Sequence, residues 1–583
     1  MKRTLTILLA LCLLVSMFAA CGSSSTDSAA AAETASSEAA SAASESEPEA
    51  EEAAEPAAEE IAEEAAEPAS AEEPAEEPAE EEIVVEYPLV DEPTTLTYWH
   101  NLATGSAVDA DEYDDLIVLQ QQEEITGVHI ENVIVSEDAE TEKFSLMIAG
   151  GDYCDLIEHF VSLYTGGGVA GIADDMIVDI AEYEDLIPNY MSVINSSDEL
   201  SKCVKNDEGQ MACFYNVYNE PSMAPVCGLV IRKDWLDELG MDIPETYDEL
   251  DTVLHAFQST YGCSKTLYMV ESGVFEGNTL IDGYGVAGYM NTQGSHQAAP
   301  FYLDGDEVKF GLVEDGFMDY IDMMHGWYED GIISSDFVTA AGNPMDTEFI
   351  SAVTNNESGL FSCAYMVYTT IESSAIDEDF EMVGIPDIGK EPGQELKNGF
   401  APTYVQDSGS SISAYSDNIE LAIQWSDFWY SWDGGVMKSF GIEGESFEYD
   451  ENGQPQFTSL ITDNPDGLTY TAAKQYYSFG VSGLYFETNE VTDDVQAARD
   501  AWCTNKTGEG VISDWITLTT EETEEYNSYW SDIGTYAAEC VNKFITGDMT
   551  ADDFDTFKET LDSMGLQECI AIQQAAVDRF NAR

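Results

Sequence analysis

Several residue patterns in the chain could carry catalysis or cofactor binding, but each lacks the surroundings that such a site needs. Gly283 to Gly288 read GYGVAG, the glycine pattern of dinucleotide-binding loops, yet no helical pattern follows, which favours a plain loop. The six histidines form no H-E-x-x-H zinc motif, and no G-x-S-x-G nucleophile elbow occurs. With 115 acidic residues, paired carboxylates arise by chance. We therefore expect no catalytic site, no cofactor and no metal, and a protein that is not an enzyme.

The excess of acidic over basic residues limits the kinds of molecule that the protein can bind. The chain has 19 Lys+Arg against 115 Asp+Glu, a formal net charge of -96, and no basic residue between Arg3 and Lys143. Nucleic acid is excluded as a partner, because binding to phosphates depends on Lys and Arg. The charge favours a soluble monomer and uncharged or cationic ligands over polyanions.

The cysteines do not form a metal-binding or redox pattern. Of the 11 cysteines, Cys12 lies in an N-terminal leader and Cys21 directly follows it, and the other nine are scattered singly without a C-x-x-C pair. Zinc is disfavoured without paired ligands. We expect mostly buried thiols, with a Cys203–Cys213 disulfide left open.

Residues 1–20 have the layout of a secretory signal peptide, with Lys2 and Arg3 before an apolar run. This run is shorter than the about 20 apolar residues that span a bilayer. The residues FAAC, ending at Cys21, resemble the lipobox of bacterial lipoproteins, with Phe18 in place of the usual Leu. The resemblance implies that Cys21 is lipidated and holds the mature protein on the outer face of the bacterial cell membrane. An ordinary signal-peptidase site before a cysteine is the alternative.

Residues 21–92 are dominated by Ala, Glu, Ser and Pro. Dense like charge with few apolar side chains cannot offset the entropy of ordering, and recurrent prolines interrupt a helix. The composition predicts a disordered acidic linker between the anchor and a folded body.

The body begins where helical and strand patterns start to alternate. TTLTYWHNLATG predicts a first strand around Leu96 and Tyr98 that ends in a loop over residues 99–105. A helix over residues 142–150 and a short strand in DYCDLIEHF follow. This order predicts an α/β fold of parallel sheets covered by helices.

The segment RKDWLDELGMDIPETYDELDTVLHAF, residues 232–257, predicts two packed helices. The first ends at Gly240, and Thr246 with Glu249 forms a capping box that opens the second. The sequence of this segment is similar to that at the start of the second lobe in the extracellular solute-binding proteins, family 1, of ABC importers. YIDMMHGWYEDGIISSDF, SISAYSDNIELAIQWSDFWYS and GIEGESFEYDENGQPQFT resemble later segments of the oligosaccharide-type lipoproteins of that family, in the same order.

This resemblance implies a two-lobed, type II periplasmic-binding-protein-like fold that traps a ligand between its lobes. By the family's pattern the first lobe holds residues 93–210 and 383–440, and the second holds residues 211–382 and 441–583. The implied function is capture of a carbohydrate, a neutral oligosaccharide in particular, for delivery to the transmembrane subunits of an ABC permease.

Sugar sites need aromatic platforms surrounded by polar groups, and strand ends are where these are expected. The family pattern puts the loops of Trp99, His100 and Asn101 and of Tyr164 on the first lobe's ligand side, and Tyr365 on the second. Further candidates are Tyr215, near the hinge, and Tyr284, in the glycine-rich loop. Core packing is the alternative role for each aromatic residue.

Two other functions remain open from the sequence. An exported glycan hydrolase would use two carboxylates. The same fold could also bind a peptide or another small metabolite.

Overall fold

The computed structural model describes residues 85–102, 106–110, 112–222, 226–268, 279–286, 300–339, 347–397, 403–478, 481–488 and 491–583. All of them lie in the compact unit Glu80–Arg583. The predicted signal peptide, the proposed lipidation site Cys21 and the linker as far as residue 84 lie outside the described residues.

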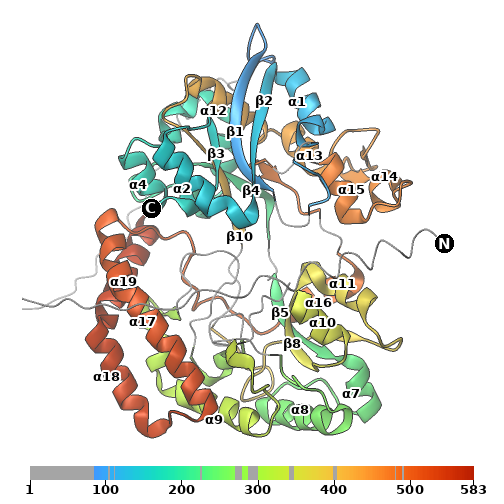
Figure 1. The fold of residues 1–583 in the computed structure, drawn as a ribbon, viewed down its shortest axis with the longest axis vertical. Coiled ribbons are helices and arrows are strands. Elements are labelled where there is room, and N and C mark those ends of the chain that lie inside the picture. Colours follow the sequence, from blue (N-terminus) through green and yellow to red (C-terminus); the bar gives the residue numbers. More distant parts are fainter. Residues whose placement is uncertain are drawn as a thin grey trace, which may run out of the picture. The chain divides into compact units, whose positions relative to one another are not determined.

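A six-stranded sheet organises the first part of the fold, with strand order β13-β4-β10-β3-β1-β2 (Figure 1). Its strands are β1 (Thr94–Leu102), β2 (Val128–Ser136), β3 (Leu156–Glu158), β4 (Phe214–Ser222), β10 (Thr403–Ile412) and β13 (Leu484–Tyr485). Five of these strands run parallel, and β10 runs antiparallel to both of its neighbours. The parallel sheet expected from the sequence is confirmed here, apart from β10.

Helices cover both faces of this sheet, because neighbouring residues of a strand face opposite sides. On one face the ring of Tyr98 lies 6.4 Å from that of Trp425. On the other, the ring of Trp99 lies 5.9 Å from that of Phe144. The helices packed with these cores are α1 (Ile117–Thr126), α2 (Glu140–Gly150), α3 (Phe160–Leu163), α4 (Gly167–Ala173), α5 (Pro188–Ile194), α6 (Asp198–Val204), α12 (Ile419–Phe428), α13 (Trp432–Phe440), α14 (Ser459–Thr462) and α15 (Tyr470–Tyr477).

The second sheet has the order β8-β5-β9, with β5 (Cys227–Arg232) in the centre and antiparallel to β8 (Leu360–Ala364) and β9 (Met382–Gly384). The outer strands are parallel to each other and are joined by the crossover helix α11 (Tyr365–Ser374). The predicted β-α-β order is therefore present, but β5 is inserted between its two strands. This sheet is not parallel, because β5 enters from the opposite direction.

Two short hairpins and nine helices complete the elements in the part of the chain that the structure describes. The hairpins are β6 (Phe301–Asp304) with β7 (Glu307–Phe310), and β11 (Phe447–Tyr449) with β12 (Pro455–Phe457). Besides α11, the helices in the described ranges are α7 (Lys233–Leu239), α8 (Tyr247–Tyr261), α9 (Asp315–Glu329), α10 (Thr347–Thr354), α16 (Asp493–Trp502), α17 (Thr520–Thr546), α18 (Phe554–Met564) and α19 (Leu566–Ala582). Short 3-10 helices span Tyr113–Asp115, Glu137–Ala139, Ile180–Leu186, Thr279–Tyr284, Gly311–Val313, Phe337–Thr339 and Ala551–Asp553.

The pair of helices predicted between residues 232 and 257 is confirmed. α7 ends at Gly240, whose φ of 67° is a left-handed conformation that glycine adopts without strain. α8 opens with the predicted capping box of Thr246 and Glu249. Its apolar stripe is buried in the larger hydrophobic core together with α9 and α17.

Three sequence-based boundaries differ from the structure. The end of the predicted linker is packed, because Leu89 and Val90 lie against the first core and the Leu89 N–H donates to the Thr126 carbonyl. The first strand continues to Leu102 instead of ending before Trp99. Residues 441–583 are predicted to belong to the second lobe, whereas β13 within them pairs with β4 of the first sheet.

No disulfide joins the cysteines in the part of the chain that the structure describes. The Cys203–Cys213 disulfide that the sequence left open is therefore not formed. Burial raises the pKa of Cys203 to about 12. Both thiols contact the first core, as small apolar side chains do.

Candidate functional site

The carboxyl ends of β1, β2, β3, β4 and β13 meet at one edge of the six-stranded sheet. In open α/β sheets, ligands bind at this edge, where loops and helix starts present polar groups. We call it the carboxyl edge. The polar side chains that the structure brings to it come from β1, the start of α2, the end of β3, β4 and α13.

Glu140, the first residue of α2, is the centre of a hydrogen-bonded group at this edge. Its Oε1 accepts from Asn101 Nδ2 at 3.0 Å and lies 2.8 Å from His159 Nδ1. Asn101 belongs to β1, and His159 directly follows β3. The Glu140 and His159 side chains are 14% and 24% exposed, so both retain access to a ligand. His159 has a φ of 58°, a left-handed conformation that is uncommon outside glycine and that marks a constrained position.

Behind this group lies a buried acid. Glu158 is 8% exposed, and burial raises the pKa of its carboxyl, while the neighbouring His159 and His100 act in the opposite direction. His100 is itself buried, with Nε2 placed 3.1 Å from Asn132 Oδ1. Its ring lies between those of Tyr98 and Tyr113, at 5.0 and 4.9 Å. His100 is thus packed inside the fold behind the carboxyl edge and does not point into solvent.

A buried lysine adds a positive group to the same region. Lys438 of α13 donates from Nζ to Asn216 Oδ1 of β4, and the same oxygen accepts the Gly483 N–H at 3.1 Å. Burial lowers the pKa of Lys438 to about 7, and Glu158 partly opposes that shift. The amine is therefore near its point of half-protonation at neutral pH.

Tyr365 lies at a second location, where β8 passes into α11. The guanidinium of Arg499 lies over its ring, 4.5 Å from the centroid, and Arg499 Nη1 also donates to Glu487 Oε1 at 2.9 Å. Glu487 follows β13 of the first sheet, whereas Arg499 belongs to α16 beside the second. These contacts connect the two sheets next to the predicted aromatic residue.

The other predicted residues lie apart from the carboxyl edge or within cores. Trp99 is 3% exposed and packs against α2. Tyr164 stacks on Phe160 at 4.9 Å and donates to Asp174 Oδ2 at 2.9 Å. Tyr215 is buried, with its ring edge-on to that of Trp515, and Tyr284 stacks on Tyr247 at 4.6 Å in the second core.

Of the predicted residues, Asn101 lies at the carboxyl edge and His100 is buried behind it, and the sequence did not suggest the groups that surround them. Glu140 begins α2, Glu158 ends β3 and His159 follows it. A correct assignment of the strands in the sequence would have placed these residues at the carboxyl edge. Asn216 and Lys438 are 222 residues apart, and no local pattern joins them.

Within the part of the chain that the structure describes, no three His, Cys, Asp or Glu side chains are arranged to hold a metal ion. None of its helices combines the length and apolar character needed to cross a bilayer.

Comparison with known proteins agrees with this architecture. No family model matches the chain. It is 21% identical over 541 residues to the fructooligosaccharide ABC transporter substrate-binding protein FusA of Streptococcus pneumoniae, an alignment that covers 85% of this chain and 92% of FusA. It is 23% identical to lipoprotein LipO of Bacillus subtilis, over 66% of this chain and 74% of LipO.

A solved structure shows the same fold. The HMO-binding, ABC-transporter-associated solute-binding protein of Bifidobacterium longum infantis superposes with a TM-score of 0.69 at 20% identity, covering 84% of this chain and 99% of that one. The chain is therefore similar to solute-binding proteins in sequence and shares their fold. Its fold is accordingly two-lobed, as the segments between residues 232 and 458 predicted by resemblance.

In a two-lobed solute-binding protein the chain must cross between lobes, and the strands show where. β4 is followed by β5, β9 by β10 and β13 by α16, and each step passes from one sheet to the other. The third step contains Glu487, the partner of Arg499. The carboxyl edge includes the ends of β4 and β13, from which two of these crossings leave the first sheet. Tyr365 lies next to Arg499 of α16, the helix that follows the third crossing.

Proposed function

We propose that this protein captures a carbohydrate, a neutral oligosaccharide in particular, between its two lobes and delivers it to the transmembrane subunits of an ABC importer. The observation that carries the proposal is the alignment with 92% of FusA, a fructooligosaccharide-binding protein. The alignment spans 541 residues and 85% of this chain.

The carboxyl edge has the chemistry that sugar hydroxyls require. A hydroxyl both donates and accepts, so it pairs with a carboxylate and a donor placed side by side. Glu140 with Asn101 and His159 supplies that combination, and these side chains orient one another through the hydrogen bonds described above. Charge-assisted hydrogen bonds of this kind are the stronger ones.

The aromatic part of the proposed site is Tyr365, from the second lobe. Its ring is held by Arg499 through a cation–π contact, and Arg499 is held by Glu487. Tyr365 is 7% exposed within the core of the second sheet, so a sugar can contact only the part of its ring that remains accessible. Trp99, predicted for the same role, is occupied by core packing with Phe144.

We assign the first lobe to residues 85–222 and 403–488 and the second to residues 226–397 and 491–583. The ligand favours the closed arrangement only through contacts that it makes with both lobes at once. The three crossings would act as the hinge. This assignment moves residues 441–488 to the first lobe, following the pairing of β13 with β4.

The proposal includes attachment to the membrane through a lipid on Cys21 and a monomeric, non-enzymatic protein. Lipidation supports durable attachment, since each buried methylene contributes about 0.8 kcal/mol. Detergent-phase partitioning of the mature protein tests it, and Cys21→Ala is expected to move the protein to the aqueous phase. Retention of Cys21→Ala in the detergent phase would contradict it.

Isothermal titration of the chain from residue 22 onward against a panel of neutral oligosaccharides tests the capture itself. We expect one binding site per chain and a negative heat-capacity change. Mass spectrometry after long incubation should show unaltered ligand, whereas cleaved glycan would favour the hydrolase alternative. Binding of peptides but of no carbohydrate would contradict the proposal.

A further inference from the structure

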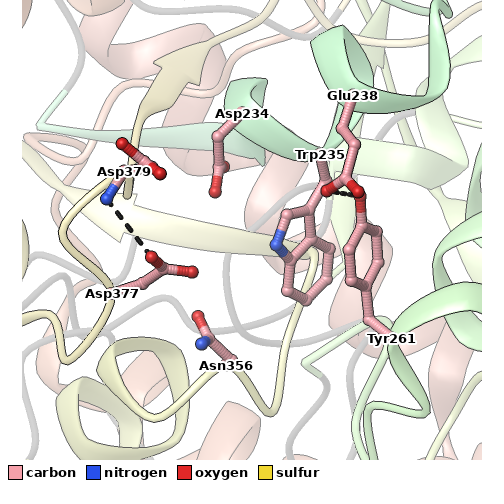
Figure 2. A pocket seen from close by; sticks show the side chains of 7 residues that line it. All are labelled: Asp234, Trp235, Glu238, Tyr261, Asn356, Asp377 and Asp379. Carbon is pink, nitrogen blue, oxygen red and sulfur yellow. Dashed lines mark hydrogen bonds between the residues drawn. The ribbon is translucent and has the colours of Figure 1, made fainter.

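A second concave site lies beside β5 and away from the residues assigned to sugar binding. This pocket has a volume of about 460 Å³, within the usual range for small-molecule sites. It is formed by α7, the last residue of α8 and the loops around Asn356 and Asp377, and Figure 2 labels all of its lining side chains. None of these residues belongs to the first sheet or its carboxyl edge.

A buried arginine organises the wall of this pocket. Arg232, the last residue of β5, is fully buried, with its guanidinium 4.2 Å from the ring centroid of Trp235 and 4.3 Å from that of Phe380. It donates from Nε to Asp234 Oδ1 at 2.8 Å and from Nη1 to Asn356 Oδ1 at 2.6 Å. The charge of Asp234 is thereby matched within the wall.

Trp235 presents only one edge to the pocket. Arg232 covers one face of its ring, and Tyr261 stacks on the other with a centroid distance of 4.2 Å and an interplanar angle of 17°. The side chain is 3% exposed, and its indole N–H has no acceptor among the described residues. Figure 2 shows that the indole nitrogen faces the open space between Asp234, Asp377 and Asn356. This nitrogen is not one of the fully buried polar atoms without a partner in the described residues, so water reaches it, and a ligand hydroxyl can take the place of that water.

The remaining carboxylates give the pocket an excess of negative charge. Glu238 accepts from the Tyr261 hydroxyl at 3.0 Å. Asp377 accepts the backbone N–H of Asp379 at 3.2 Å, and within the described ranges neither of these two aspartates is paired with a basic side chain. The pocket is therefore lined by four carboxylates against one guanidinium in its wall, with Asp377 and Asp379 exposed to solvent, and this excess of negative charge attracts cations. Anionic ligands are disfavoured here.

We propose that this pocket binds a small organic cation that carries hydroxyl groups, as an amino sugar or an amino alcohol does. The ammonium group pairs with Asp377 and Asp379, and a hydroxyl oxygen accepts the Trp235 indole N–H. A metal ion fits less well, because the described carboxylates do not converge in the way a metal needs. A cation without hydroxyls would leave the indole N–H without an acceptor.

The indole N–H signals of the ¹⁵N-labelled protein give a direct readout. The chain has 9 tryptophans, and the signal absent from Trp235→Phe identifies Trp235. Titration with glucosamine, whose amine is protonated below neutral pH, should shift this signal along a saturable curve. Asp377→Asn combined with Asp379→Asn should weaken the apparent affinity at least tenfold. Asp555→Asn, an exposed carboxylate of α18, is the matched control and should change nothing.

Neutral and hydroxyl-free probes complete the experiment. Glucose and N-acetylglucosamine lack the charge and should leave the Trp235 signal unchanged, and putrescine lacks hydroxyls and should bind more weakly than glucosamine. An unshifted signal, or an equal response in the double variant, would overturn the proposal. Glu140→Gln should leave the glucosamine response intact, so a failure here is distinguishable from a failure of oligosaccharide capture.

Discussion

His159 Nδ1 lies 2.8 Å from Glu140 Oε1, although β3 and the start of α2 contribute these residues separately. Asn101 Nδ2 donates to the same oxygen, so three elements that follow or end parallel strands converge on one atom. The remaining carboxylate oxygen of Glu140 is available to a ligand hydroxyl. This convergence is the structural basis for placing the sugar site at the carboxyl edge.

Glu140→Gln is expected to weaken carbohydrate binding at least tenfold. The substitution removes a charged acceptor, and hydrogen bonds to charged groups contribute about 1.5–3 kcal/mol each. Glu142→Gln is the matched control, because it removes the same charge from an exposed position in the same turn of α2. Titration calorimetry compares the two. An equal loss in both variants would indicate a general charge effect and contradict the role of Glu140.

Lys438 should make stability depend on pH above neutrality. Its amine holds its proton up to about pH 7 in the folded protein and up to about 10.5 when unfolded. The unfolded state then binds more protons between these values, so the free energy of unfolding rises with pH. Relative to Lys438→Met, the wild type should gain about 2 kcal/mol between pH 7 and pH 9.

Urea unfolding at both pH values measures this difference. Lys390→Met, at an exposed position, is the control and should follow the wild-type trend. If Lys438→Met showed the same pH dependence as the wild type, the buried amine would not be the titrating group.

Trp99 and Trp432 should differ in what they contribute to stability. Trp99 is 3% exposed within a core, whereas Trp432 is 45% exposed. Trp99→Ala should lower the free energy of unfolding by about 3–5 kcal/mol, and Trp432→Ala by much less. Thermal unfolding compares them. If Trp99→Ala kept its stability but lost carbohydrate binding, Trp99 would be a ligand-binding residue and not a core residue.

Gly228 allows β5 to pass under the ring of Trp502. A Cβ at this position would lie 2.3 Å from Trp502 Cγ, and the Trp502 indole N–H donates to the Leu229 carbonyl at 2.8 Å. Gly228→Ala should therefore destabilise the protein by about 1–3 kcal/mol. Gly326→Ala, in the interior of α9 with open space around it, should stabilise it by about 0.5–1 kcal/mol. A neutral Gly228→Ala in denaturant unfolding would show that the contact can relax.

The local elements were predictable where their signals are local. The capping box of Thr246 and the glycine stop at Gly240 are each contained in a few residues. The strand that continues through His100 and Asn101 was missed, because these polar residues end an apolar pattern. Their partners Asn132 and Glu140 lie in other elements and satisfy them within the fold.

Long-range pairing was the part that the sequence could not specify. β13 has only two residues, too few for a periodic pattern, yet it joins the first sheet by pairing with β4. The insertion of β5 between β8 and β9 likewise depends on contacts more than 120 residues apart, such as Val230 with Phe361. Trp99, predicted from the family pattern, and Tyr284, predicted from the glycine-rich loop, pack in cores because their neighbours come from distant elements.

A crystal structure of the protein with the tightest-binding oligosaccharide from the titration panel tests the central claim most directly. The account predicts a carbohydrate between the lobes, with a hydroxyl within hydrogen-bonding distance of Glu140 and a sugar ring against Tyr365. A carbohydrate bound elsewhere, with the carboxyl edge in contact with solvent only, would contradict it.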